Sequence, residues 1–250
     1  MFELLEEELL RCSDAGEVAP FWWRDDDAQS ASTELDDVLE ISARCRAPLS
    51  LAVVPDGLEV SLSERLTGLE HVQVLQHGFD HRNYAPADVR KMELGWHRPG
   101  EQIAQQISIG FERLRALFGE QFVPVMVPPW NRIDERVIAQ LQEIGFTGLS
   151  TLGPRNGLEQ EAELKLVNVH VDIINWTQGR CFAGVSACEA QIVAHLSAKR
   201  EGRVDANEPT GIMSHHLVHD DGCRQFLADL FEYLGTHEDA ILLDAKTVFA

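Results

Sequence analysis

Short apolar runs alternate with amphipathic segments along most of the chain. An apolar run bounded by polar residues is typical of a buried strand, and an apolar stripe of period 3.6 is typical of a helix. The strand-like runs are residues 21–24, 49–54, 72–76, 122–127, 147–150, 166–174, 211–215 and 241–243. The helical segments include residues 33–45, 99–118, 134–144, 187–199 and 223–234. Strands that alternate with helices favour a mostly parallel sheet, closed or open, with the helices outside it.

This alternation continues without an interruption that would mark a domain boundary. No linker rich in Pro, Gly or Ser divides the chain, and no internal repeat is visible. A length of 250 residues fits either one α/β barrel or two modest domains. We therefore expect a single domain over residues 1–250. The amphipathic pattern of residues 1–13 predicts an additional helix, which we expect to cover one open end or seam of the sheet.

Net charge is the feature of the composition that excludes the most classes of binding partner. The chain has 21 Lys and Arg against 41 Asp and Glu, which gives a formal net charge of −20. Nucleic acids and anionic membranes are bound by clustered Lys and Arg. The acidic balance therefore argues against both as partners. The sequence does not indicate an oligomeric state.

The cysteines and the N-terminal segment bear on location. The five cysteines are odd in number and form no CxxC pair, which argues against a disulfide framework and a zinc ribbon. The N-terminal segment is acidic and lacks the basic region of a signal peptide. No apolar stretch approaches the ~20 residues needed to span a bilayer. We therefore expect a cytoplasmic protein.

Clusters of polar residues stand where three of the expected strands end. Asp25–Asp27 follow the first strand, His77 and His81 follow the third, and His215 and His216 end the seventh. Carboxylates and imidazoles are common ligands of divalent metals. The carboxyl ends of parallel strands meet at one rim of a sheet, where α/β folds keep their chemistry. We therefore expect a metal site at this rim, built from these side chains.

The clusters leave alternatives open. Adjacent strand residues point to opposite faces, so at most two of Asp25, Asp26 and Asp27 can serve one site directly. A solvated acidic turn that caps a helix is the alternative to a metal site for this run. The alternation of strand residues also means that only one of His215 and His216 enters the site, and we favour His215.

Two further segments end near the same rim. One contains Pro128, Pro129 and Trp130 directly after a strand, and the other joins Asp172 to Trp176. Indole rings at such a rim often form the wall of a sugar pocket, although Trp is also common in cores. The candidate substrate-binding residues are Trp130, Asn131, Arg132, Trp176 and His216.

Taken in order, these motifs resemble those of the polysaccharide deacetylase superfamily, also called the NodB-homology or carbohydrate esterase family 4 domain. The resemblance extends from about Phe21 to Leu243. Asp26 and Asp27 resemble the Asp pair of its first motif, which implies that Asp26 is the catalytic base and Asp27 a metal ligand. Asp25 and Asp26 are the alternative match to this pair. His77 and His81 match its His-x-x-x-His motif, which implies that both bind the metal. The resemblance also implies the fold, a distorted (β/α)7-type barrel.

The third motif of the family departs from its usual form in this chain. The Pro and the aromatic residue are present as Pro129 and Trp130, but the preceding Arg is absent. In the family that Arg steadies the catalytic Asp, and Arg24 or Arg132 could take its place. Asp172 and Trp176 resemble the fourth motif. His215, or its neighbour His216, resembles the catalytic acid of the fifth.

The resemblance implies a metal-dependent hydrolase of a non-peptide C–N bond. A divalent metal, most often zinc, would polarise the substrate carbonyl, while a base activates water and an acid protonates the departing amine. An N-acetyl group on a carbohydrate or on a small intracellular amide fits this chemistry. The alternative is a weakly active or inactive protein that keeps the fold and binds such ligands. The implied catalytic set is Asp26, His215, Asp172 and Arg24, and the implied metal ligands are Asp27, His77 and His81.

Overall fold

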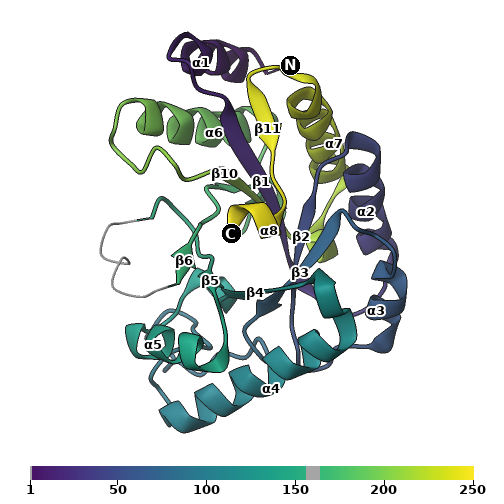
Figure 1. Ribbon diagram of the computed structural model, residues 1–250, viewed down its shortest axis with the longest axis vertical. Coiled ribbons are helices and arrows are strands. Elements are labelled where there is room, and N and C mark those ends of the chain that lie inside the picture. Colours follow the sequence, from purple (N-terminus) through teal and green to yellow (C-terminus); the bar gives the residue numbers. More distant parts are fainter. Residues whose placement is uncertain (1, 156–163) are drawn as a thin grey trace.

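The chain folds around a curled parallel sheet (Figure 1). The computed structural model describes residues 2–155 and 164–250. The strands of the main sheet lie in the order β6-β5-β4-β3-β2-β1-β10-β7, and each is parallel to its neighbours. Their bounds are β1 Ala19–Ala28, β2 Leu49–Val53, β3 Val72–His77, β4 Phe122–Val127, β5 Gly148–Leu149, β6 Lys165–Leu166, β7 Val171–Asp172 and β10 Thr210–Ser214. β11 (Ala240–Leu242) pairs with the start of β1, and β8 (Ile174–Asn175) forms an antiparallel pair with β9 (Cys181–Phe182).

The longer helices surround this sheet on its outer side, whereas a short C-terminal helix lies inside the ring of strands (Figure 1). The helices are α1 Glu3–Asp14, α2 Thr33–Cys45, α3 Val60–Leu66, α4 Gly100–Phe118, α5 Glu135–Ile144, α6 Val185–Arg200, α7 Asp221–Thr236 and α8 Ala245–Val248. Single 3₁₀ turns follow α4 (η1, Gly119–Gln121), β4 (η2, Pro129–Asn131) and β10 (η4, His216–Val218). Among the described residues, no helix combines the length and apolarity that crossing a membrane requires.

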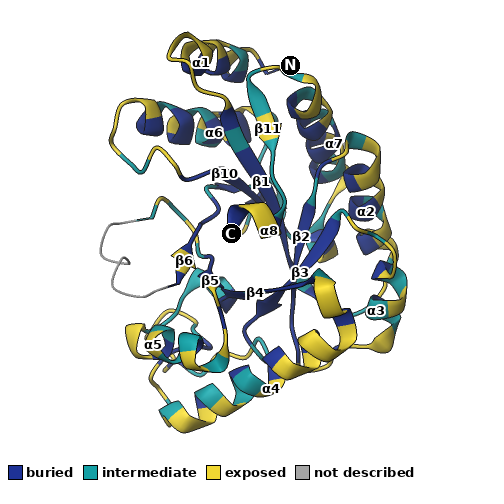
Figure 2. Ribbon diagram, in the orientation of Figure 1, coloured by how far each residue is buried: buried dark blue, intermediate teal, exposed yellow. Residues whose placement is uncertain are grey.

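The central strands are buried on both faces, which explains why they read as continuous apolar runs (Figure 2). One apolar cluster fills the space between the sheet and the outer helices, and a second fills the interior of the barrel. In the interior, the indole of Trp22 packs edge-on against Phe249, with ring centroids 5.6 Å apart. Its Nε1–H donates to the carbonyl of Asn168. The interior is therefore a packed core that anchors β1.

The predicted α/β barrel is confirmed, with two local differences. The strand predicted over residues 166–174 is divided: β6 pairs with β5 at one edge of the sheet and β7 pairs with β10 at the other. Residues 167–170 connect β6 at one edge of the sheet to β7 at the other edge. The apolar run therefore contributes two short strands instead of one. The N-terminal helix, which was expected over an open end or seam of the sheet, packs instead against another helix. α1 lies outside the sheet on α6, where the Glu189 carboxylate accepts the N–H groups of Leu4 and Leu5.

Candidate active site

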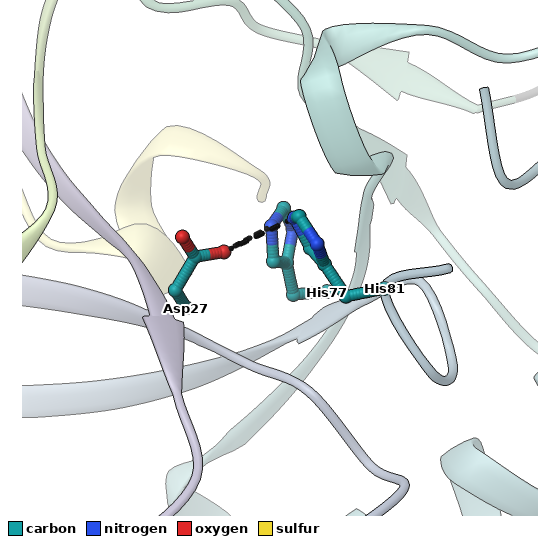
Figure 3. A group of neighbouring side chains, drawn as sticks. All are labelled: Asp27, His77 and His81. Atoms are coloured by element: carbon teal, nitrogen blue, oxygen red, sulfur yellow. Dashed lines mark ion pairs between the residues drawn. The ribbon is translucent and has the colours of Figure 1, made fainter. Parts of the chain in front are cut away.

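Three possible metal ligands converge at the carboxyl ends of β1 and β3 (Figure 3). Oδ1 of Asp27 lies 3.1 Å from Nε2 of His77 and 3.2 Å from Nε2 of His81. Asp27 is the penultimate residue of β1, His77 ends β3, and His81 lies in the loop that follows. The parallel sheet thus brings together side chains that are fifty residues apart in sequence, as expected from the strand ends.

The protonation of His77 shows that these residues fit a cation. Its Nδ1 lies 2.9 Å from the carbonyl oxygen of Val127, which can only accept, so Nδ1 carries the hydrogen. In the neutral ring, Nε2 then directs a lone pair at the Asp27 carboxylate. Two acceptor atoms at this distance repel one another unless a cation lies between them. A ring N–H donated to a backbone carbonyl is also the usual outer partner of a metal-binding histidine.

A proton can compete with a metal ion for the space between His77 and Asp27. Burial alone would lower the pKa of His77, but the adjoining Asp27 carboxylate and the charge of Asp26 raise it. Burial likewise opposes ionisation of Asp27, yet the neighbouring His77 lowers the pKa of this carboxyl overall. Because metal and proton compete for these atoms, metal affinity is expected to fall as the pH falls.

Strained backbone is concentrated at this rim. Among the described residues, six other than glycine have positive φ, and four of them are Asp27 (77°), His81 (53°), Trp130 (57°) and Asn131 (54°). Such conformations cost roughly 1–3 kcal/mol each and persist where the surrounding structure imposes them, often at functional sites. At Asp27 the strain accompanies a shift in the pairing of β1 with β2 between Asp25 and Ala28. The shift breaks the alternation, and Asp26 and Asp27 both reach the rim.

Arg24 holds Asp26 in place. Its Nε donates to Oδ1 of Asp26 and its Nη2 to Oδ2, both at 2.9 Å, in a fully buried two-pronged pair. Nη1 also donates to the carbonyl and hydroxyl oxygens of Ser150, and Nη2 to Oδ1 of Asn131. Arg132 instead donates to the carbonyl of Lys91. Of the two arginines considered from the sequence, Arg24 therefore occupies the position that steadies Asp26.

His215 faces Asp26 from the end of β10. Its Nε2 lies 4.0 Å from Oδ2 of Asp26. Its ring packs edge-on against the Trp176 indole at 4.8 Å, and the indole N–H donates to Oδ2 of Asp172 at 2.8 Å. Burial raises the pKa of Asp172. Asp172 thus orients His215 through Trp176, and its carboxylate forms no direct hydrogen bond with the imidazole.

His216 points away from this rim. Its imidazole is 1% exposed, and its Nδ1–H donates to the buried carboxylate of Asp25. The hydroxyl of Ser214 donates to the other oxygen of Asp25 at 2.5 Å. His216 is therefore enclosed in the core, and the substrate-binding role that we assigned to it has no support in its placement. Asp25 instead holds the residues on both sides of His215.

Glu93 is a residue of this site that the sequence did not reveal. It is fully buried, and its carboxylate accepts the N–H of Phe79 at 2.6 Å and that of His81 at 2.8 Å. Burial raises the pKa of Glu93 to about 7. A Cβ at Gly78 would lie 2.6 Å from both Glu93 and Pro129, so only glycine permits this approach. A lone acidic residue in a polar loop gives no sequence signal for such a role.

The remaining candidate residues divide by function. The Trp130 ring lies 4.6 Å from the ring of His81, and the Trp176 ring is 42% exposed beside His215. The two indoles are therefore placed to contact a ligand at the rim. Asn131 uses its side-chain oxygen to bind Arg24, which makes it part of the support for Asp26.

A second cluster, of His170, His195 and Glu208, also has metal-like spacing but does not suit a metal. Nδ1 of His170 accepts the N–H of Gly211 at 3.0 Å, so a neutral ring carries its hydrogen on Nε2. That atom faces Oε2 of Glu208 at 3.4 Å as a donor and has no lone pair to offer a metal. The tautomers of His77 and His170 thus distinguish the two clusters found in the described part of the chain, and of these two the cluster of Asp27, His77 and His81 fits a divalent ion.

The role of Arg24 can be tested through stability. Arg24→Met should lower the free energy of unfolding by about 3–5 kcal/mol, because it leaves the Asp26 carboxylate buried without its partner. Arg132→Met, which removes a half-exposed arginine at the same rim, should change it by only about 0.5 kcal/mol. Urea denaturation of both variants measures the difference. Equal effects would mean that Arg24 is not the partner on which Asp26 depends.

Comparison with known proteins supports the fold. No protein-family model matches the sequence, and neither does any curated protein sequence. A protein from Mycobacterium smegmatis assigned as a polysaccharide deacetylase is similar with a TM-score of 0.65 and 16% identity, over 93% of this chain and 89% of that chain. A family 4 acetyl xylan esterase from Clostridium thermocellum, in complex with a cobalt ion, has a TM-score of 0.55 and 12% identity, over 92% and 90% of the two chains.

A third solved structure is a mutant of BA3943, a CE4 family pseudoenzyme with restored enzymatic activity. It has a TM-score of 0.58 and 12% identity, over 94% of this chain and 68% of that chain. At these identities the similarity shows the fold alone. It confirms the deacetylase-like distorted barrel that the sequence motifs implied.

Proposed function

We propose that this protein is a metal-dependent hydrolase of a non-peptide amide bond, in which the acyl group is an N-acetyl group on a carbohydrate or on a small amide. The observation that carries the proposal is the convergence of Asp27, His77 and His81 beside an Asp26 carboxylate that Arg24 holds in one orientation. His215 lies opposite Asp26 at the same rim. A ligand set, a candidate base and a candidate acid therefore share one site.

The residues divide the reaction between them. A divalent ion held by Asp27, His77 and His81, with zinc as our first choice, would polarise the amide carbonyl and supply positive charge to the developing oxyanion. Asp26 accepts a proton from the attacking water as the new C–O bond forms. His215 donates a proton to the amine nitrogen as the C–N bond breaks, giving a carboxylic acid and a free amine. Arg24 and Trp176 keep the base and the acid in position.

A second candidate function is ligand binding without turnover. It is favoured by the absence of the usual third-motif arginine and by the occurrence of this fold in a pseudoenzyme. The bidentate pair of Arg24 with Asp26 supplies an equivalent partner from β1, and this is why we place the hydrolase first.

The two functions are separated by a metal-dependent assay. The purified protein is loaded with zinc or cobalt and incubated with a panel of N-acetylated sugars and small amides, and release of acetate and amine is measured. We expect turnover that disappears on chelation and returns when metal is added back. Stabilisation by a ligand in a thermal-shift assay, with no turnover above the chelated control at high protein concentration, would instead support the binding protein.

A further inference from the structure

Three cationic side chains gather beside the metal ligands. Arg90 and Lys91 lie in the loop between β3 and α4, and Arg132 follows η2. Arg90 and Lys91 are exposed and Arg132 is half-buried. We call these three residues the basic patch.

Contacts join the basic patch to the active site. A guanidinium N–H of Arg132 donates to the carbonyl of Lys91 at 2.8 Å, which links the two loops. Nζ of Lys91 lies 5.9 Å from the centroid of the Trp130 ring, and that ring lies 4.6 Å from the ring of His81. The Trp130 ring therefore lies between the ammonium group of Lys91 and the candidate metal ligand His81.

Among residues 2–155 and 164–250, no carboxylate forms an ion pair with the basic patch. In a chain with 41 acidic residues, none of the three cations forms an ion pair with any residue in the described part of the chain. Elsewhere on the surface, Arg65 and Arg115 pair with Asp36 and Glu112. Burial and the charge of Arg90 both lower the pKa of Arg132, as expected of like charges held close together.

The acidic residues of the same loop are largely committed elsewhere. Asp80 accepts the N–H of Arg82 and the hydroxyl of Tyr84. Glu93 is buried on the backbone that carries His81. Asp88 is exposed but does not pair with the basic patch. This side of the rim therefore presents uncompensated positive charge in a protein of formal net charge −20, a local field that favours anions.

We propose that the basic patch binds an anionic substituent, a carboxylate or a phosphate, of the carbohydrate whose amide lies at the metal site. The guanidinium of Arg132 suits two-pronged binding of either group, and Lys91 contributes a point charge. Trp130 lies between the patch and His81, where it can pack against the sugar ring. This inference rests on the proposed function and names the substrate class that the site selects.

The test compares sugars that differ in charge. Calorimetry on the zinc-loaded protein measures the Kd of N-acetylglucosamine, of N-acetylmuramic acid, which adds a carboxylate, and of N-acetylglucosamine 6-phosphate. At least one anionic sugar should bind about tenfold more tightly than the neutral one at low salt, and the advantage should shrink as salt rises. The two anionic sugars distinguish a carboxylate site from a phosphate site.

Variants locate the effect. Arg132→Gln and the double variant Arg90→Gln/Lys91→Gln should each reduce the ratio of the neutral-sugar Kd to the anionic-sugar Kd to about one. Arg115→Gln is the matched control, because it removes one positive charge from the C-terminal turn of α4 and should change nothing. Equal affinity for neutral and anionic sugars, or an advantage that survives in the patch variants, would overturn the inference. A charge-dependent affinity without any turnover would overturn the proposed hydrolase and leave the anion site standing.

Discussion

Replacing His77 and His81 together by alanine is expected to abolish stoichiometric binding of a divalent metal, and with it the amide hydrolysis. Two of the three converging ligand atoms belong to these imidazoles, and the remaining one, Oδ1 of Asp27, cannot hold an ion alone. Equilibrium dialysis against zinc followed by elemental analysis measures the loss. Circular dichroism of the variant establishes that the fold is retained.

The second histidine cluster provides the control for this experiment. His170→Ala/His195→Ala removes two buried imidazoles of similar metal-like spacing, but the hydrogen bonding of His170 argues against a metal there. We expect this variant to bind zinc with the same stoichiometry as the unaltered protein. Zinc retained without His77 and His81, or lost without His170 and His195, would show that the ligands have been misidentified.

Replacing His215 by alanine is expected to lower turnover by about 10²–10⁴-fold while leaving the metal content unchanged. His215 is the imidazole that faces Asp26, at 4.0 Å, and it does not belong to the converging ligand set. Loss of the acid leaves the amine to depart without a proton, so kcat falls more than the affinity for substrate. Steady-state kinetics and elemental analysis on the same preparation separate the two quantities.

His216 supplies the comparison for His215. Its imidazole is buried on Asp25, so His216→Gln should lower the free energy of unfolding and affect turnover much less per folded molecule. A large loss of turnover in the His216 variant with full activity in His215→Ala would reverse the assignment of the acid. Loss of metal in His215→Ala would place that residue among the ligands.

The sequence predicted the parts of the fold that depend on local pattern. α2 begins and ends at the predicted residues because an amphipathic stripe follows Ser32, whose hydroxyl caps the N–H of Leu35. The convergence of the Asp25–Asp27 run with His77 and His81 was predicted from the rule that parallel strands end at one rim. The choice of Asp27 as the ligand came from the family resemblance. Residues 166–174 were misread because an apolar run cannot show that the chain leaves one edge of the sheet and joins the other.

Support of the site by distant residues could be predicted only in part. Arg24 and Asp26 are two residues apart in a strand and share a face, so their pairing was open to prediction from the sequence. Glu93 and Asp25 were not, because each binds backbone or side chains that only the folded chain brings near. The β1 irregularity that turns both Asp26 and Asp27 to the rim has no signal in three consecutive aspartates.

The metal position itself can be observed by anomalous diffraction from crystals grown with zinc, collected on both sides of the zinc absorption edge. We expect one strong peak per chain, at about 2.0–2.2 Å from Oδ1 of Asp27 and from Nε2 of His77 and His81. No peak at this rim, or a peak between His170 and Glu208 instead, would contradict the proposed metal centre and the hydrolase built on it.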